Sequence, residues 1–103
     1  MTSKTITKWT RKPQEKEGSY FFAGQFYTTS GVATELTVEE IMEIYVDAKN
    51  YVWHNDGADY IFVYTDEQGR KLFFIDNLNK EMIESGEYGP EHDYCTLMFA
   101  SEY

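Results

Sequence analysis

The stretch DYIFVYTDEQGRKLFFID, residues 59–76, decides the fold that we expect. Two runs rich in β-branched and aromatic residues, Asp59–Thr65 and Arg70–Asp76, flank a four-residue segment that ends at Gly69. A glycine-containing loop of this length is a common hairpin connection. The stretch therefore predicts an antiparallel hairpin. Both faces of its strands carry apolar residues, so one face should pack on a helix. The other face is either covered by a second element or left as an aromatic surface.

The helix that would cover this hairpin is predicted over residues 38–50. Thr37 and Glu40 have the spacing of a capping box, and acidic residues in the first turn suit the helix dipole. An apolar stripe with helical spacing follows, formed by Val38, Ile41, Met42, Tyr45 and Ala48, with Ile44 beside it. We expect Ile41, Met42, Tyr45 and Ala48 to face the sheet, and Asn50 to end the helix.

Two further strands complete the expected sheet. Tyr20–Thr28 is rich in aromatic residues, with a bulge or bend at Gly24, and Thr29-Ser30-Gly31 breaks it. Tyr94–Ser101 is the expected final buried strand, and residues 77–93 form a long loop with one helical turn around Lys80–Glu84. The fold class is therefore α+β, a small antiparallel sheet with one principal helix packed on one face.

The chain divides into a polar, mildly basic N-terminal segment, residues 1–18, and a single α+β domain, residues 19–103. Within the first segment, Thr5–Trp9 is either a short edge strand or part of a flexible arm. Residues 1–34 carry 5 basic and 2 acidic residues, and residues 35–103 carry 4 and 16, for a formal net charge of -9. Such an anionic body attracts basic surfaces and repels nucleic acid and anionic membranes, although acidity can also serve solubility alone. Aromatic strands without a positive field do not favour direct RNA binding.

The sequence predicts neither catalysis nor a cofactor or metal site. Cys95 lies in a predicted core strand, where a thiol is inert, and a single cysteine suits a reducing compartment. His54 and His92 have acidic neighbours, but no fixed spacing joins them into a site. Residues 55–59 lack the closing glutamate of a calcium loop and are expected to form a turn. With no secretory leader or membrane-spanning run, we expect a cytoplasmic protein.

The remaining candidate site is a group of acids interleaved with tyrosine in the long loop. Its proposed partner-binding residues are Glu81, Glu84, Glu87, Tyr88, Glu91 and Asp93. Tyrosine is a common interface anchor, and closely spaced carboxylates can occupy positions that phosphates take on a basic groove. The alternatives are that these acids only solvate the loop, or that the aromatic face of the hairpin makes the contact.

The C-terminal stretch Thr96–Tyr103, TLMFASEY, resembles the closing Leu-Thr-Ile-Met-Leu-Ala-x-Glu-Tyr motif of a domain-of-unknown-function family. Thr29–Ala33 is similar to that family's Thr-x-Gly-Val segment. Asn55-Asp56 and Phe73–Asp76 are similar to its Asn-Asp-Pro and Trp-Lys-Ile-Asp-Tyr-Tyr segments, in the same order. The proline after Asn-Asp and the Trp-Lys before Ile-Asp are missing here. The family consists of small plasmid- and phage-borne bacterial proteins, so the resemblance implies a mobile-element origin and a bacterial host cell.

Together, charge and resemblance favour an acidic inhibitor that binds a basic, nucleic-acid-handling protein, such as a nuclease or effector complex. Anti-CRISPR and anti-restriction proteins are the types that the resemblance implies, with imitation of nucleic acid as one route. A generic interaction or regulatory module without mimicry is the second hypothesis, and an enzyme is the third.

Overall fold

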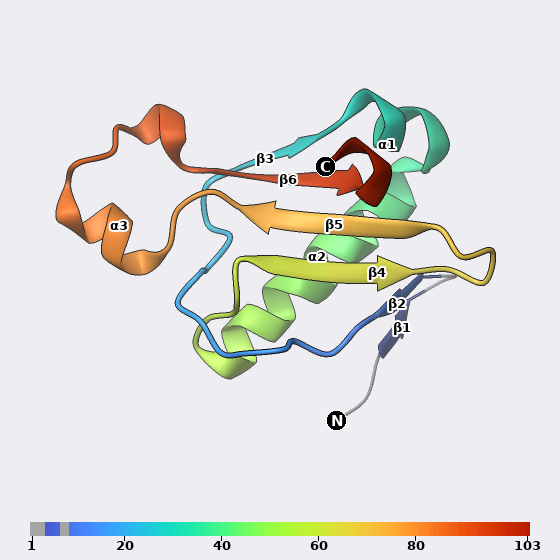
Figure 1. Ribbon diagram of the computed structural model, residues 1–103, viewed down its shortest axis with the longest axis horizontal. Helices are drawn as coiled ribbons and strands as arrows, with labels where there is room; N and C mark the ends of the chain where they lie inside the picture. Colours follow the sequence, from blue (N-terminus) through green and yellow to red (C-terminus); the bar gives the residue numbers. More distant parts are fainter. Residues whose placement is uncertain (1–3, 7–8) are drawn as a thin grey trace.

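A single sheet of six strands organises the computed structural model, which describes residues 4–6 and 9–103 (Figure 1). The strands are β1 (Lys4–Ile6), β2 (Trp9–Arg11), β3 (Gln25–Thr28), β4 (Ile61–Thr65), β5 (Lys71–Asp76) and β6 (Tyr94–Phe99). Their order across the sheet is β1-β2-β4-β5-β6-β3. The predicted α+β fold is confirmed. Four of the five neighbouring pairs are antiparallel, whereas β3 pairs with β6 in parallel at one edge.

The predicted hairpin forms the centre of the sheet. β4 and β5 pair antiparallel, with Phe62 opposite Phe74. In the loop between them, the Asp66 carboxylate accepts hydrogen bonds from the backbone N–H of Gln68 and Arg70 and from Arg70 Nε, at 2.8–3.1 Å. The Asp66 carboxylate thus satisfies backbone N–H groups of the loop and holds the loop in one conformation between the two paired strands.

The principal helix, α2 (Val38–Asn55), is longer than predicted. The capping box of Thr37 and Glu40 is confirmed. Asn50 does not end the helix, because the next turn continues the apolar pattern with Val52, which is buried. The helix ends instead at Asp56, which takes the left-handed conformation of a C-cap.

The face of α2 that packs on the sheet also differs in part from the prediction. Ala48 is buried, and Ile41 and Tyr45 are half-buried against the core. Met42 is 45% exposed and was wrongly assigned to this face, while Ile44 is only 1% exposed. The helix has apolar residues on both sides, so periodicity alone left the orientation open. The buried face is set by Ile44, Asp47, Ala48 and Val52.

The strand predicted over Tyr20–Thr28 is confirmed only for its second half, β3. The chain before it is irregular and bends at Gly24, where a Cβ atom would collide with the carbonyl of Asp93. After β3, a short helix that the sequence did not predict, α1 (Ser30–Glu35), begins with Thr29 as its N-cap.

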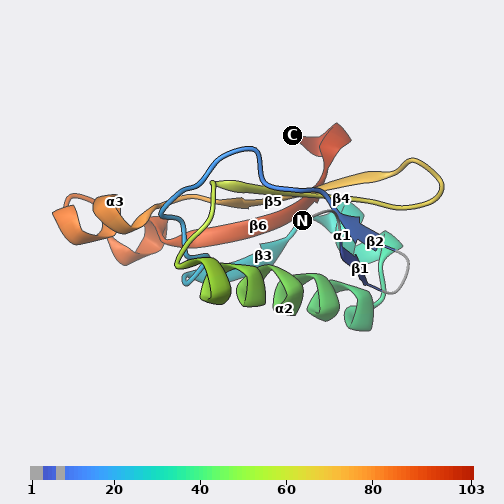
Figure 2. The ribbon, with the colours of Figure 1, turned by 90° about the horizontal axis from the view of Figure 1, so that it is seen from below.

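The last part of the chain follows the prediction closely. The helical turn in the long loop is α3 (Lys80–Ser85), and a 3-10 turn, η1 (Pro90–His92), precedes the buried strand β6. A second 3-10 turn, η2 (Ala100–Glu102), follows that strand. α3 and η1 project beyond the strand ends at one end of the sheet (Figures 1 and 2).

The N-terminal segment joins the sheet rather than lying apart from it. β1 and β2 form its far edge, which matches the edge-strand alternative where the structure describes it. Trp9 is fully buried, and Arg11 Nε lies 2.7 Å from the Asp47 carboxylate, which also accepts the Tyr64 hydroxyl at 3.0 Å. Residues 9–11 therefore share the sheet and the core with the rest of the described chain.

The core lies between α2 and one face of the sheet (Figure 2). It is largely aromatic, since Phe22, Phe62 and Phe74 are all buried and their ring centroids lie 4.8–6.4 Å apart. On the other face, Phe73 is half-buried and meets the ring of Tyr103 at 5.5 Å. Within the described residues, no helix combines the length and the hydropathy that a membrane span requires.

Candidate protein-binding site

The irregular segment Ser19–Gly24 is held in an unusual conformation between the helices and the sheet. Phe22 has φ +53°, a left-handed conformation that is costly for a bulky residue, and yet its side chain is fully buried. Its N–H donates to Asp76 Oδ2 at 2.9 Å, and its carbonyl accepts from Lys49 Nζ at 2.8 Å. Bonds from β5 and α2 thus fix this turn of the chain from two sides.

The same segment also attaches α3. The Ser19 hydroxyl donates to Glu81 Oε1 at 2.6 Å, and the Ser19 carbonyl accepts the backbone N–H of Lys80 at 2.9 Å. The Ser19 hydrogen bond is the main reason that the pKa of Glu81 is lowered. The helix starts with an N-cap, because Asn79 accepts from the N–H of Met82 at 2.8 Å. Segment 19–24 therefore fixes where α3 begins.

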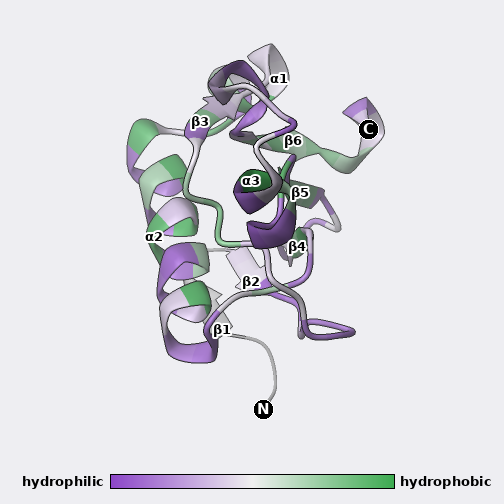
Figure 3. Ribbon diagram, turned by 90° about the vertical axis from the view of Figure 1, so that its left-hand side faces the viewer, coloured by the Kyte–Doolittle hydropathy of each residue, from purple (hydrophilic) through white to green (hydrophobic). Residues whose placement is uncertain are grey.

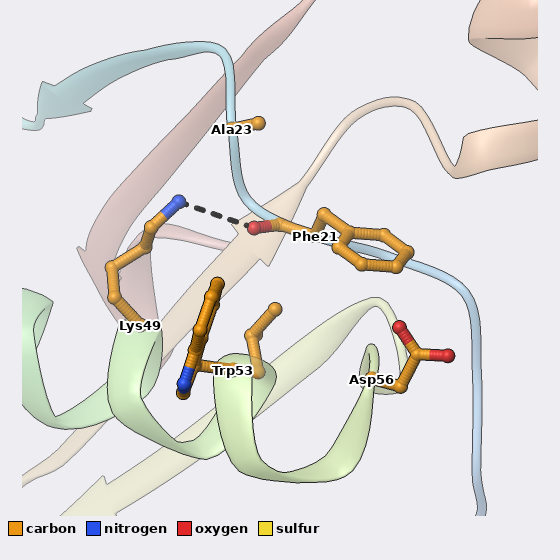
Figure 4. Close-up of a pocket in the computed structure, with 6 residues that line it drawn as sticks. Phe21, Ala23, Lys49, Trp53 and Asp56 are labelled. Carbon is orange, nitrogen blue, oxygen red and sulfur yellow. Dashed lines mark hydrogen bonds between the residues drawn. The ribbon is translucent and has the colours of Figure 1, made fainter.

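Between the end of α2 and α3 lies a surface depression that we call the Phe21 groove. It consists of two adjoining hollows of about 390 Å³ each, and both are lined by Phe21, Ala23 and Asp56. The first hollow is completed by Lys49, Val52 and Trp53, and the second by Lys80, Ile83 and Glu84. In Figure 4, Lys49 and Trp53 rise from α2 beside Phe21, with a dashed line from Lys49 to the Phe21 carbonyl at 3.3 Å.

Two large apolar side chains on the walls of the groove face solvent. Trp53 is 83% exposed, and Ile83 is 45% exposed. Tryptophan is expensive to leave in water and is enriched among the residues that dominate protein interfaces. The groove thus presents apolar surface beside residues 21–22, whose backbone is held by hydrogen bonds to Asp76 and Lys49.

The predicted partner-binding residues lie next to this groove, in a region that we call the acidic lobe, residues 80–93. Glu84, Glu87 and Glu91 are exposed, and Tyr88 is 42% exposed. Figure 3 views this end of the molecule, with hydrophilic and hydrophobic residues side by side on α3. Because Glu84 also lines the groove, the lobe and the groove form one continuous surface.

The other two predicted residues have structural contacts as well. Glu81 is exposed but bound to Ser19. Asp93 is half-buried, and its carbonyl accepts the N–H of Gln25 at 3.1 Å beside Gly24. Asp93 therefore helps to place the start of β3, whereas Glu84, Glu87 and Glu91 are exposed.

Sequence reasoning missed the apolar half of this surface. Phe21 was assigned to a regular strand, and Trp53 lay beyond the predicted end of the helix. The available signal was the apolar pattern itself: Val52 extends the buried stripe past Asn50, and the adjacent Trp53 then falls on the outer side of that turn.

The remaining reactive side chains do not gather at the groove. The buried Cys95 thiol has its pKa raised to about 12 by desolvation and by the nearby Asp76 carboxyl. His54 is exposed and contacts the Asn50 carbonyl at 2.8 Å, and His92 lies 3.6 Å from the Glu91 carboxylate. The turn predicted over residues 55–59 is confirmed only in part, because Asn55 is the last residue of α2 and Ala58 pairs with Tyr20, while Asp56 and Gly57 have positive φ. In the described part of the chain, no three ligating side chains come together as a metal site would require.

The fold and this surface define a small α+β domain with an acidic lobe beside an apolar groove. Comparison with family models, curated proteins and solved structures finds no match to this chain.

Proposed function

We propose that the protein is an acidic inhibitor that binds a basic, nucleic-acid-handling protein through the acidic lobe. One observation carries this proposal. The carboxylates of Glu84, Glu87 and Glu91 are exposed on a projecting part of the molecule, and no lysine or arginine within the described residues forms an ion pair with them. Glu91 has His92 Nε2 at 3.6 Å, and exposed carboxylates that no lysine or arginine neutralises retain their field for an incoming partner.

The physical basis is charge complementarity. A groove that binds nucleic acid carries a positive potential built for phosphates, and the formal net charge of this chain is -9. Complementary potentials raise the association rate and orient the encounter. Carboxylates on a fixed lobe can then occupy phosphate positions on the partner, which would exclude its nucleic acid.

The proposal is tested with the triple charge reversal Glu84→Lys, Glu87→Lys, Glu91→Lys. A matched control, Glu15→Lys, Glu43→Lys, Glu67→Lys, changes the net charge equally at exposed positions outside the lobe. Each protein is titrated into DNA-cleavage assays with a panel of CRISPR effector nucleases and restriction enzymes. Inhibition by the natural sequence should be lost in the lobe variant, largely retained in the control, and weakened steeply by salt.

The second candidate function is an interaction module that uses the half-buried outer face of the hairpin. Val63 and Phe73 are paired across the strands on that face, whereas Phe62 faces α2 and is fully buried. The discriminating variant is therefore Val63→Ala with Phe73→Ala, with circular dichroism as the folding control. Loss of inhibition in this pair but not in the lobe reversal would replace the electrostatic proposal.

A further inference from the structure

We infer that the Phe21 groove receives one apolar side chain of the partner that is flanked by lysine or arginine. This inference rests on the proposed function, because it names the anchor of the same interface. The inference adds a second requirement for the partner, besides its positive charge. The partner must present an apolar residue within its basic surface, so a polycation without such a residue would bind less tightly.

The first argument is that the groove is already formed. Its floor, Phe21 and Ala23, belongs to the segment that Lys49 and Asp76 hold on either side of Phe22. A fixed backbone loses little conformational entropy on binding, so more of the contact energy appears as affinity. The φ of +53° at Phe22 is a strained backbone conformation, and the surrounding contacts of the fold maintain it.

The second argument is the kind of side chain that fits. Two hollows of about 390 Å³ meet at Phe21, with Trp53 on one side and Ile83 on the other. These walls are mainly apolar and exposed to water. A leucine, methionine or phenylalanine seated against Phe21 would cover apolar surface of the groove, which is favourable.

The third argument is the charge of the acidic lobe beside the groove, which favours a basic partner. The groove has two carboxylates, Asp56 and Glu84, and two ammonium groups, Lys49 and Lys80. The Lys49 ammonium already donates to two backbone carbonyls. The adjoining lobe adds further carboxylates, so the field around the anchor is negative. A second copy of this chain, also with net charge -9, would be repelled.

The experiment uses three synthetic peptides of equal length and the full chain. The first has a central phenylalanine, leucine or methionine between lysines. The second replaces the apolar residue with serine, and the third replaces the lysines with glutamates. Binding is followed by tryptophan emission, since Trp53 is exposed and Trp9 is buried, and the spectrum of Trp53→Phe identifies the Trp53 contribution. Amide chemical shifts locate the contact.

The apolar basic peptide should bind at least tenfold more tightly than the serine peptide, shift Trp53 emission to shorter wavelength, and perturb amides around Phe21 and Ile83. Ile83→Ser should remove the tenfold difference. Val46→Ser, on α2 but outside the groove and 49% exposed, should leave it unchanged. Circular dichroism checks both folds.

Three results overturn the inference. Equal binding of the apolar and serine peptides would show that the groove does not bind an apolar side chain. Charge-driven binding, and with it the proposed function, would still stand. Tight binding of the glutamate peptide would contradict both. If none of the peptides binds, the groove is not an anchor site, and the lobe reversal in the cleavage assay decides the proposed function separately.

Discussion

The Thr29 hydroxyl donates a hydrogen bond of 2.7 Å to the carboxylate of Glu102, a residue 73 positions later in the chain. The same carboxylate accepts the backbone N–H of Phe99 at 2.9 Å, and Thr29 also caps α1. One pair of side chains therefore ties the start of a helix to the end of β6. Thr29 and Glu102, far apart in the sequence, thus bring the start of α1 into direct contact with η2.

Thr29→Val should lower the free energy of unfolding by about 1 kcal/mol, the usual cost of losing an N-cap. The pKa of Glu102 is lowered, mainly by the Thr29 hydrogen bond. A lowered carboxyl pKa stabilises the fold at neutral pH, and that contribution is lost as the pH falls through the lowered value. Urea unfolding should therefore show that the difference in unfolding free energy between the natural sequence and Thr29→Val becomes smaller in acid. An equal difference at pH 7 and pH 3 would exclude a role for the carboxylate.

Ile44→Ala should cost about 2–5 kcal/mol, because it removes a fully packed side chain from the core. Met42→Ala, two residues earlier on the same helix, should cost less than about 1 kcal/mol, since Met42 is 45% exposed. Thermal and urea unfolding measure both. Similar losses for the two variants would mean that α2 presents a different face to the sheet.

Arg11→Met should destabilise the protein by about 1.5–3 kcal/mol, because it removes a charge-assisted hydrogen bond of 2.7 Å to the Asp47 carboxylate. Lys12→Met, at the next and exposed position, is the control and should change little. If Arg11→Met is as stable as the control, the N-terminal segment contributes little to the packed fold.

The stability of the protein should fall as the pH rises through about 6, owing to Asp76. Desolvation raises the pKa of this carboxyl from 3.8 to about 6, with a further contribution from Asp93 and opposition from hydrogen bonds such as that of Phe22 N–H. A carboxyl with a raised pKa favours the folded state while it is protonated. The difference in unfolding free energy between the natural sequence and Asp76→Asn should therefore shrink from pH 4.5 to 7.5, and parallel curves would contradict this assignment.

Cys95 should resist alkylation in the native protein. It is fully buried, and its pKa of about 12 leaves almost no thiolate at neutral pH. Labelling by iodoacetamide should become rapid only in denaturant, at the rate set by unfolding. Fast labelling of the folded chain, measured by mass spectrometry, would show that β6 opens locally.

The elements with strong local signals were predictable from the sequence. The hairpin has strand-forming residues around a polar turn, and the capping box marks the start of α2; both appear where expected. The helical turn after Asn79 was predictable for the same reason. In each case the deciding interactions lie within a few residues of one another.

The parts that could not be predicted depend on contacts between distant segments. Residues 20–24 favour a strand by composition, but the bonds of Phe22 to Asp76 and Lys49 hold them in an irregular turn. Whether Ile44 or Met42 faces the core depends on where the sheet lies. The acidic residues of the lobe were visible in the sequence, but the groove beside them exists only because segment 19–24 lies between α2 and α3.

The parallel edge pair has a consequence for the synthesis of the chain. β3 is made early, but among the described strands it pairs with β6 alone, which is synthesised about 70 residues and several seconds later at ordinary elongation rates. β1 and β2 can pair with each other at once, but β2 meets its second neighbour, β4, only later. During that interval the nascent chain carries aromatic segments without their partners. We therefore expect the β5–β6–β3 edge of the sheet to assemble last, after residues 94–99 have been synthesised.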